Sequence, residues 1–359
     1  MKAAVCRAFK QPLTIEHVDL AAPRAREVRV RIAACAICHS DLLAMDGAWG
    51  GDLPAVFGHE AAGVVEEAGA GVARVGPGDH VIVTLLRSCG YCHFCAKGEA
   101  QHCETQLPLD LRSPLTARDG STIRQGLRTG AFAEQVVVDA SQIALIPREM
   151  PLESASLLAC GVITGLGAVL NTAAVRPGSN VATIGTGGVG LNCVQGAALS
   201  SAKVNLAIDV SDHKLAAARL FGASHTINSR EENSRDAVRL LTAGRGADYV
   251  FVAAGSAAAI EQGVTLLRRG GTLVVVGMPA EGVKVRLEAV DIADRGYRIL
   301  GSKMGSTRLR IDIPLLADWY LQGRLKLEEL ISGRYALEQI NQATESARSG
   351  AALRNVITF

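Results

Sequence analysis

Aromatic residues, an excess of charge of one sign and long apolar runs are all scarce in this 359-residue chain. Phe, Trp and Tyr make up 4% of the residues, and the formal net charge at pH 7 is +2. A nearly neutral chain has no general attraction for nucleic acid or an anionic membrane. No apolar run approaches the roughly eighteen residues of a membrane span, and charged residues interrupt the start. We therefore expect a cytoplasmic protein without nucleic-acid or membrane partners.

Small and apolar residues are plentiful. The chain is 48% hydrophobic and contains 38 glycines, a composition typical of α/β enzymes with many tight turns. Its length exceeds the size at which one hydrophobic core usually stops growing, so two domains are expected. The nine cysteines are expected to be reduced thiols or thiolate ligands, since the chain has no secretory signature.

The pattern of apolar residues changes near residue 160. Before it, short alternating stretches separated by glycine predict antiparallel strands in a mainly β domain. After residue 181, apolar strands alternate with helical stretches, which is typical of a doubly wound parallel sheet with helices on both faces. The strands expected in the first part are 28–32, 61–66, 80–85 and 132–138. Those expected in the second part are 181–184, 204–208, 249–252, 272–276 and 298–300, with helices at 191–199, 213–221 and 234–241.

The end of the chain is expected to return to the first domain. Amphipathic helices are predicted at 310–322 and 337–348, and a closing strand at 354–358. The fold class is therefore α/β. One domain comprises 1–160 and 303–359, and the other 161–302. The polar stretch 104–128 lacks periodicity and is expected to be a surface loop.

Four cysteines lie within fifteen residues in the spacing C-x2-C-x2-C-x7-C: Cys89, Cys92, Cys95 and Cys103. Zinc prefers four soft ligands in a tetrahedron, and a loop of short steps can supply them, so the spacing favours a structural zinc site. An iron-sulfur cluster or surplus thiols are the alternatives. A closed site of this kind performs no chemistry, so the active centre must lie elsewhere.

A glycine motif follows the strand at 181–184. Its residues Gly185, Gly187, Gly188, Val189 and Gly190 form G-x-G-x-x-G before a helical run. This context predicts a dinucleotide site, with the pyrophosphate at the helix N-terminus. Nineteen residues after Gly190, Asp209 ends the next strand, where a carboxylate accepts from a ribose and repels a 2′-phosphate. NAD is therefore favoured over NADP. Lys214 is a candidate for the same ribose, or a solvated helix lysine.

A second set of candidate metal ligands is dispersed along the chain: Cys38, His59 and Cys160. Two thiolates and one imidazole leave a fourth position for water or substrate, which is the arrangement of a catalytic zinc. Taken singly, a cysteine before a glycine is usually a packing residue and a lone histidine a satisfied polar group. The conjunction with a dinucleotide motif and a separate thiolate cluster favours the metal site.

These motifs, together with Gly58-His59-Glu60-Ala61-Ala62-Gly63 and the terminal Arg354-Asn355-Val356-Ile357-Thr358-Phe359, resemble zinc-dependent medium-chain alcohol dehydrogenases nearly end to end. The extended stretch after the cysteine cluster is more similar to the dimeric animal and glutathione-dependent classes than to the shorter tetrameric bacterial form. The resemblance implies a Rossmann NAD-binding domain and a GroES-like catalytic domain carrying two zinc ions.

The same resemblance implies roles for individual residues. Zinc binds the alcohol oxygen and lowers its pKa, and hydride passes to the nicotinamide. Ser40 matches the hydroxyl that takes the alcohol proton, and Asp41 the carboxylate that orients the ligand histidine. Glu60 matches a buried acid beside the metal. His39 and Arg354 match pyrophosphate contacts, although surface salt-bridge or capping roles are the simpler alternatives.

One position departs from many relatives, which carry a histidine five residues after the first zinc cysteine, where this chain has Leu43. An apolar side chain cannot pass a proton, so protons are expected to leave through Ser40, the cofactor ribose and water. Metal spacing places Leu43, Trp49 and Leu85 near the substrate in an apolar pocket, although Trp49 is equally a candidate for core packing.

The sequence therefore predicts an NAD-dependent zinc alcohol dehydrogenase that interconverts a primary or secondary alcohol and its aldehyde or ketone. Oxidation of S-(hydroxymethyl)glutathione is the alternative reaction, for which Arg112, Arg124 and Arg128 are candidate anion-binding residues. A non-catalytic dinucleotide-binding protein and a zinc-ribbon nucleic-acid module are alternatives of other classes. The strand at 272–276 and the residues near Met278 are candidates for pairing two subunits into a homodimer, with a homotetramer as the other possibility.

Overall fold

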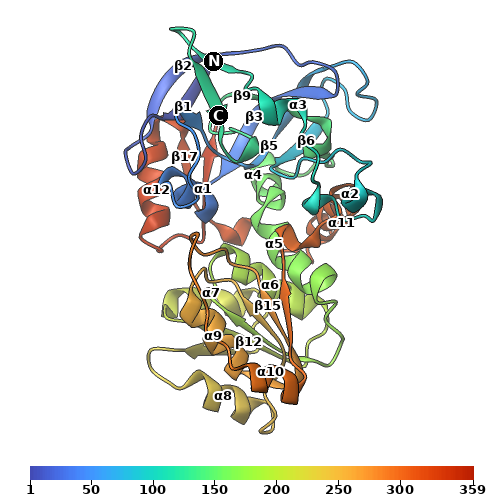
Figure 1. Ribbon diagram of the computed structural model, residues 1–359, viewed down its shortest axis with the longest axis vertical. Helices are drawn as coiled ribbons and strands as arrows, with labels where there is room; N and C mark the ends of the chain where they lie inside the picture. Colours follow the sequence, from blue (N-terminus) through green and yellow to red (C-terminus); the bar gives the residue numbers. More distant parts are fainter. The chain divides into compact units, whose positions relative to one another are not determined.

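The computed structural model describes residues 1–359 as two compact units. The first unit comprises Met1–Cys160 and Arg308–Phe359, and the second comprises Gly161–Thr307 (Figure 1). The sequence placed this boundary between 302 and 303. Residues 303–307 instead pack within the second unit, where the hydroxyl groups of Ser302 and Ser306 each lie 2.9 Å from Oγ1 of Thr172.

The first unit is built from two β structures. A closed barrel has the strand order β1-β2-β7-β8-β4, and a seven-stranded sheet has the order β10-β6-β5-β3-β18-β17, with β9 also paired to β3. The barrel strands are β1 (Lys2–Cys6), β2 (Thr14–Leu20), β4 (Ala55–Val56), β7 (Leu115–Ala117) and β8 (Thr122–Gln125). The sheet strands are β3 (Glu27–Ala36), β5 (Glu60–Ala68), β6 (His80–Thr84), β9 (Gln135–Asp139), β10 (Ile143–Leu145), β17 (Ile331–Ala336) and β18 (Arg354–Thr358).

Strand β3 shows why these residues form a half-buried sheet. Val28, Val30 and Ile32 are at most 1% exposed, whereas Arg31 between them is exposed. Successive strand residues point to opposite faces, so this alternation places one face in the core. The predicted mainly β, antiparallel organisation is confirmed, with two parallel exceptions, β4 with β8 and β17 with β18.

The prediction of a surface loop at 104–128 is wrong. This segment contains α3 (Pro108–Leu111), β7, β8 and the 3-10 turn η2 (Gly126–Arg128). Leu115, Ala117 and Ile123 are at most 4% exposed and join the core of the first unit. Strands of three or four residues are too short to show periodicity, and their pairing with β2 and β4 decides their structure.

The chain end returns to the first unit, as predicted. Strand β18 pairs antiparallel with β3, with Val356 opposite Ala36, and α11 and α12 precede it. The predicted helices at 310–322 and 337–348 correspond to α11 (Leu309–Leu321) and to η8 (Leu337–Gln339) followed by α12 (Ile340–Arg348). The other short helices of this unit are α1 (His39–Met45), α2 (His93–Ala96), η1 (Ala100–His102), η3 (Ala140–Gln142), α4 (Leu152–Ser156), η4 (Leu157–Ala159) and η7 (Glu328–Leu330).

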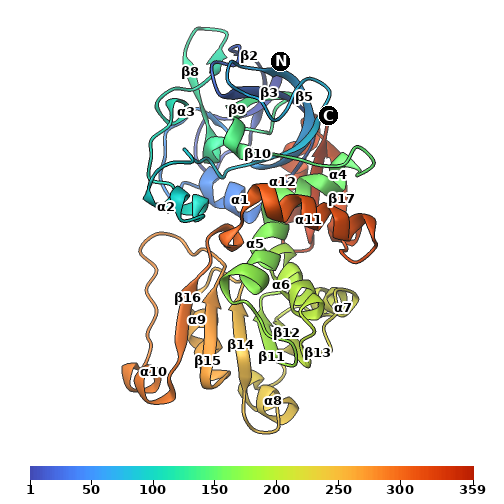
Figure 2. The same cartoon turned by 90° about the vertical axis from the view of Figure 1, so that its right-hand side faces the viewer.

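The second unit is a parallel six-stranded sheet in the order β13-β12-β11-β14-β15-β16 (Figure 2). This order, in which the first strand of the unit lies beside the fourth, is that of a doubly wound dinucleotide-binding fold. The strands are β11 (Asn180–Ile184), β12 (Val204–Asp209), β13 (His225–Asn228), β14 (Ala247–Val252), β15 (Leu267–Val275) and β16 (Arg298–Gly301). The helices are α5 (Gly161–Gly167), the π-helical η5 (Ala168–Thr172), α6 (Gly188–Leu199), α7 (Asp212–Leu220), α8 (Ser234–Leu241), α9 (Ala257–Thr265) and α10 (Ala289–Arg295), with the turn η6 (Met304–Ser306).

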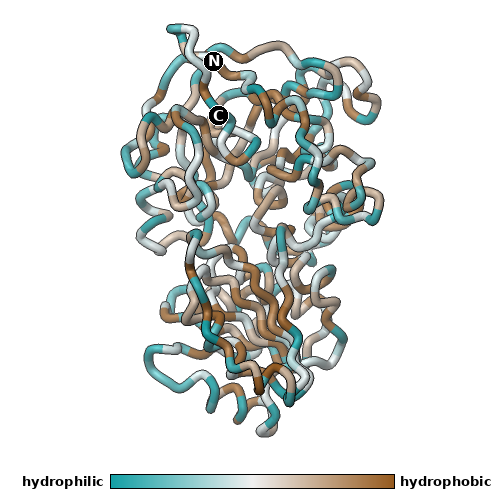
Figure 3. Tube along the Cα trace, viewed as in Figure 1, coloured by the Kyte–Doolittle hydropathy of each residue, from teal (hydrophilic) through white to brown (hydrophobic).

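Both faces of this sheet are covered. One apolar cluster joins Ala182 and Ile184 to residues of α8 and α9, and another joins Val181 to residues of η5 and α6. Neighbouring residues of β11 therefore contribute to opposite cores, so the central strands are mostly apolar (Figure 3).

No single helix is long and apolar enough to cross a membrane, although one bent pair, Leu152–Ala159 with Gly161–Thr172, has the necessary length and composition.

Candidate functional site

Three side chains from distant parts of the first unit converge on one buried point. Cys38 precedes α1, His59 precedes β5, and Cys160 follows η4. Sγ of Cys38 lies 3.9 Å from Sγ of Cys160, which lies 3.2 Å from Nε2 of His59. All three residues are buried, and their ligand atoms lie within 4.8 Å of one another. The structure thus brings together the dispersed set predicted from the sequence.

Asp41 orients this group from behind. Its Oδ1 lies 2.9 Å from Nδ1 of His59 and accepts from the backbone N–H of Gly58 at 3.0 Å, while Oδ2 accepts from the N–H of Cys38 at 3.1 Å. The carboxylate is fully buried. Because Nδ1 faces this carboxylate, Nε2 faces the two sulfur atoms, the usual arrangement behind a metal-binding histidine.

The three groups shift one another's proton affinity. The pKa of the Cys38 thiol lies well below its ordinary value because Cys160 hydrogen-bonds to it and His59 adds positive charge. The same hydrogen bond, together with burial, raises the pKa of Cys160. Burial disfavours a charged His59, but the Asp41 carboxylate and Cys38 outweigh it and raise its pKa. A thiolate is therefore already favoured at this point.

This donor set fits zinc. Two sulfur atoms and one imidazole nitrogen, mutually within 4.8 Å, can occupy three corners of a tetrahedron and leave the fourth for water or substrate. A divalent cation would also displace protons from these groups, because it binds cysteine as the thiolate and histidine as the neutral imidazole. The position of the Asp41 carboxylate is what such a site requires on its outer side.

The Asp41 contact can be tested directly. We expect Asp41→Asn to weaken binding of the catalytic metal by about 10–100-fold, because the ligand histidine loses its charged partner. Metal content after timed exposure to a chelator measures this. Asp46→Asn is the matched control, since Asp46 ends the same helix but pairs with Arg348 at a partly exposed site. Equal metal retention in both variants would contradict the assigned role.

Glu60 and Arg354 form a second buried pair in the first unit. Nε of Arg354 lies 3.6 Å from Oε1 of Glu60, with exposures of 8% and 0%. Burial disfavours the charged arginine, but Glu60 and then Cys38 outweigh it and raise the pKa of Arg354. The predicted pyrophosphate contact of Arg354 and the predicted metal-side role of Glu60 both stay predictions.

The other candidates of the first unit lie on or near α1 and β6. His39 is exposed and Ser40 half-buried in the first turn of α1. Leu43 is half-buried in the same helix, and Leu85 is half-buried just after β6. Trp49 is half-buried and packs against the core, so part of its indole serves as packing. The catalytic and pocket roles of these residues stay predictions.

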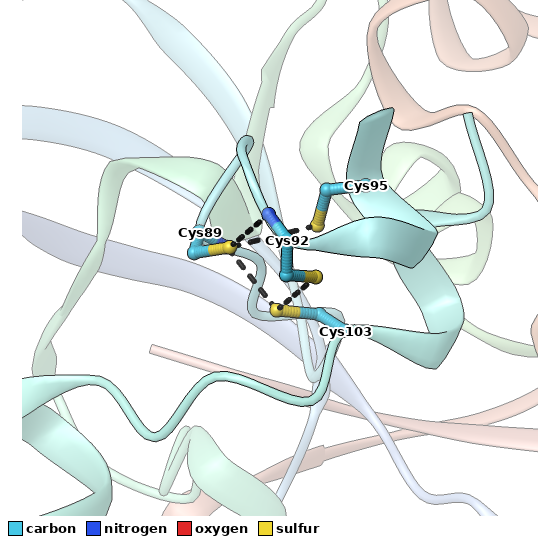
Figure 4. A group of neighbouring side chains, drawn as sticks. All are labelled: Cys89, Cys92, Cys95 and Cys103. Carbon is cyan, nitrogen blue, oxygen red and sulfur yellow. Dashed lines mark hydrogen bonds between the residues drawn. The ribbon is translucent and has the colours of Figure 1, made fainter. Parts of the chain in front are cut away.

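The four clustered cysteines also converge. Figure 4 shows their sulfur atoms pointing toward one another. The Sγ–Sγ distances are 3.9 Å between Cys89 and Cys95 and 3.9 Å between Cys92 and Cys103. All nine cysteines of the chain are free thiols. The set fits a closed tetrahedral zinc site, as its spacing predicts.

Hydrogen bonds to the sulfur atom of Cys89 stabilise its thiolate, which is the form that binds a cation. Oγ1 of Thr105 donates to Sγ of Cys89 at 3.1 Å, and the N–H groups of Tyr91 and Cys92 donate to the same atom. Against desolvation, these donors lower the pKa of Cys89 to about 6. Thr105 was not predicted, because no spacing rule links a threonine to a cysteine sixteen residues earlier.

The glycine motif occupies the turn between β11 and α6. Gly185 has φ +86°, a conformation that suits glycine. A Cβ on Gly190 would lie 1.7 Å from the carbonyl oxygen of Gly185, so only glycine lets the helix approach the strand. A Cβ on Gly187 would meet nothing within 4 Å, which leaves the backbone open to a pyrophosphate.

Asp209 ends β12 beside this turn. Its Oδ2 accepts from the N–H and hydroxyl of Thr186 at 2.6 and 3.1 Å, and Oδ1 accepts from the N–H of Val210 at 2.8 Å. Thr186 is a partner that the sequence did not predict, since it occupies a variable position of the glycine motif. Lys214 is half-buried in α7. The contacts of Asp209 and Lys214 with a ribose stay predictions.

Comparison with known proteins agrees with this geometry. A model of the alcohol dehydrogenase GroES-like domain matches residues 24–148, and a model of the zinc-binding dehydrogenase matches residues 188–321. "Probable S-(hydroxymethyl)glutathione dehydrogenase 1" of Schizosaccharomyces pombe is 36% identical over 99% of this chain and 96% of its own. "Alcohol dehydrogenase class-3" of Pisum sativum is 36% identical over 99% of this chain and 97% of its own. The crystal structure of benzyl alcohol dehydrogenase from Acinetobacter calcoaceticus is 30% identical in sequence and has a TM-score of 0.93. The match covers 100% of this chain and 99% of that one.

The chain belongs to the zinc-dependent medium-chain alcohol dehydrogenase family, in a branch that is similar to class III. It is therefore an oxidoreductase with a GroES-like and a Rossmann domain, and it belongs to a family of enzymes that use zinc and a nicotinamide dinucleotide.

Proposed function

We propose that this chain is an NAD-dependent zinc enzyme that interconverts a primary or secondary alcohol and its aldehyde or ketone. The observation that carries the proposal is the buried group of Cys38, His59 and Cys160 with Asp41 behind it. Zinc held there would act as a Lewis acid toward the alcohol oxygen, and NAD would accept the hydride. A fully sulfur-ligated site could not do this, because it has no open position.

The chain's own residues then have distinct tasks. Asp41 holds the imidazole of His59 with Nε2 toward the sulfur atoms. Ser40, two residues after a ligand and half-buried, takes the alcohol proton. His39 and Arg354 bind the pyrophosphate, and Glu60 holds the guanidinium of Arg354. Leu43, Trp49 and Leu85 line an apolar substrate pocket, which favours substrates with an apolar carbon skeleton.

A substrate panel tests the proposal. Formation of NADH is followed with primary, secondary and benzylic alcohols, and with formaldehyde in the presence and absence of glutathione. Oxidation of free alcohols that stops when a chelator removes the catalytic metal supports the proposal. A fully metal-loaded protein that binds NAD but oxidises none of them would leave the non-catalytic alternative.

S-(hydroxymethyl)glutathione oxidation is the second candidate, since a relative carries that name. The arginines predicted for an anionic substrate are, however, already paired with carboxylates. Arg112 binds both oxygens of Glu27 at 2.5 and 2.6 Å, and Arg128 lies 3.2 Å from Asp110. Arg124 lies 3.4 Å from Asp52. These pairs favour a free alcohol, and turnover of formaldehyde only with glutathione would favour the second candidate.

Cofactor preference is expected to depend on Asp209. Asp209→Asn should shift the ratio of kcat/KM for NAD to that for NADP toward NADP by on the order of 100-fold, because opposing like charges cost several kcal/mol. The ratio is insensitive to partial loss of folded protein. Asp212→Asn, an exposed carboxylate in the first turn of the next helix, is the control. An unchanged ratio in Asp209→Asn would contradict the proposal.

Proton release is expected to bypass Leu43. Introducing a titratable group there, in Leu43→His, should raise the chemistry-limited rate near neutral pH and alter its pH dependence, because an imidazole can pass the proton that leucine cannot. The solvent isotope effect on turnover is the second readout. If neither the rate nor the solvent isotope effect changes under chemistry-limited conditions, the hypothesis is refuted.

We further propose that the protein works in the cytoplasm as a homodimer, with a homotetramer as the alternative assembly. Nine free thiols support a reducing compartment. The edge strand β16 and the nearby chain leave Met278 60% and Ile299 39% exposed, which supports pairing of two second units. Sedimentation of the unmodified protein and of Ile299→Lys measures the subunit number, and the variant is expected to be monomeric. A monomeric unmodified protein would contradict the proposed assembly.

A further inference from the structure

A buried arginine outside both metal-binding groups organises part of the first unit. Arg87 is 3% exposed. Its Nε donates to Oε1 of Gln142 at 2.8 Å, its Nη1 to Oδ1 of Asp110 at 2.9 Å, and its Nη2 to the carbonyl oxygen of Arg128 at 2.8 Å. A planar guanidinium can satisfy three acceptors in fixed directions, which the single ammonium of lysine cannot.

The partners of Arg87 hold the same carbonyl group. Gln142 is fully buried, and its Nε2 donates to the carbonyl oxygens of Arg128 at 3.0 Å and of Thr84 at 2.9 Å. Asp110 lies 3.2 Å from Nε of Arg128. The carbonyl oxygen of Arg128 thus accepts two hydrogen bonds from buried side chains. The guanidinium of Arg128 pairs with Asp110, the same carboxylate that binds Arg87.

The backbone at this point is strained. Leu127 has φ 48° and ψ 37°, and Arg128 has φ 62°. Two consecutive residues with side chains rarely adopt this left-handed conformation, and it persists only where surrounding contacts impose it. The hydrogen bonds from Arg87 and Gln142 to the Arg128 carbonyl are contacts of that kind.

The strained turn lies beside the chain that leads to the ligand histidine. A Cβ on Gly126 would lie 2.3 Å from Cδ1 of Phe57, so the turn packs directly on that ring. The N–H of Ala131 donates to the carbonyl oxygen of Gly58 at 2.8 Å. Phe57 and Gly58 immediately precede His59, so the segment carrying the turn restrains the backbone from which that side chain extends.

We propose that Arg87 is a positioning residue for His59. It holds the left-handed turn of Leu127 and Arg128, and this turn holds Phe57 and Gly58 in place ahead of the metal ligand. The inference rests on the proposed function, because it requires a metal bound by Cys38, His59 and Cys160. Without Arg87, the turn relaxes, His59 shifts from its position opposite the two sulfur atoms, and the catalytic metal is held less firmly.

The test uses the full chain with both metal groups filled, and a second preparation with Co²⁺ in the catalytic site. Arg87→Met removes all three hydrogen bonds, and Arg87→Lys keeps the charge beside Asp110 but loses the planar fork. Arg118→Gln is the matched control, because its exposed side chain lies on the same segment, between β7 and β8, and has no role in the proposed site. The readouts are release of the catalytic metal to a chelator, the Co²⁺ absorption spectrum, kcat and KM separately, and Tm.

We expect Arg87→Met to release the catalytic metal about tenfold faster or more, to change the Co²⁺ spectrum, and to lower kcat more than it raises KM. Arg87→Lys should fall between this variant and the parent, and Arg118→Gln should match the parent. The metal of the four-cysteine group should stay bound in all of them.

The proposal is overturned if Arg87→Met and Arg87→Lys lower only Tm, with metal release and the Co²⁺ spectrum as in the parent. If Arg87→Met does not fold, Arg87→Lys decides by the same two measurements. In either case an active parent leaves the proposed function intact. A parent that binds no metal at the three-ligand group would overturn both.

Discussion

Replacing Cys160 with alanine is expected to leave one tightly bound metal ion per subunit instead of two and to lower kcat by roughly a thousandfold or more. A Lewis acid contributes several kcal/mol of transition-state stabilisation, and each 1.36 kcal/mol is a factor of ten. Alanine removes the sulfur that lies 3.2 Å from Nε2 of His59. Elemental analysis with kcat measured on the same sample tests both effects.

A matched cysteine controls for the loss of a buried sulfur. Cys6 is also fully buried in the first unit, but it belongs to β1 and to neither metal-binding group. Cys6→Ala should keep two metal ions and near-parental kcat, with some loss of stability from the cavity. If Cys160→Ala retained both metals and full activity, the catalytic site would have to lie elsewhere and the proposed function would fail.

Cys103→Ala is expected to have the largest effect on stability. A structural zinc contributes its binding free energy to folding, about 10–16 kcal/mol for isolated zinc-finger peptides. Even a fraction of this in a larger unit would lower Tm by more than about 10 °C, given roughly 2–4 °C per kcal/mol. Thermal unfolding and metal content measured together test the expectation.

A substitution that keeps a ligand separates metal loss from the loss of the cysteine itself. Histidine also binds zinc, so Cys103→His should retain more metal and a higher Tm than Cys103→Ala. Equal Tm values for the parent and Cys103→Ala would show that the cluster formed by Cys89, Cys92, Cys95 and Cys103 does not stabilise the fold.

The sequence predicted elements best where one strong pattern decides the structure. The helix at 234–241 and the strand at 354–358 have the predicted bounds. Amphipathic periodicity marks the helix, and the β-branched residues Val356, Ile357 and Thr358 favour the strand. Strands β1, β2, β4, β10, β13 and β17 were not predicted, and β7 and β8 were assigned to a loop. Strands β7 and β8 are too short to show a preference of their own, and pairing with β2 and β4 decides their conformation.

The candidate site shows the same division. Local spacing predicted Cys89, Cys92, Cys95 and Cys103, because short loops alone bring them together. The glycine motif was predictable because each glycine answers a local need of the turn. Cys38, His59 and Cys160 are far apart in the chain, so no local spacing joins them. They were predicted as a set because they occur together with a dinucleotide motif and a separate thiolate cluster.

The sequence by itself determined the chemistry that the chain can carry: soft sulfur and nitrogen ligands, a glycine turn for phosphates and a carboxylate after the next strand. Only the tertiary structure decided which groups hydrogen-bond to these residues. Thr105 donates to Cys89, the N–H of Thr186 donates to Asp209, and Arg87 donates to the turn beside Phe57. The physical reason is that residue type sets what an atom can bind, whereas a hydrogen bond between distant residues depends on how the whole chain packs.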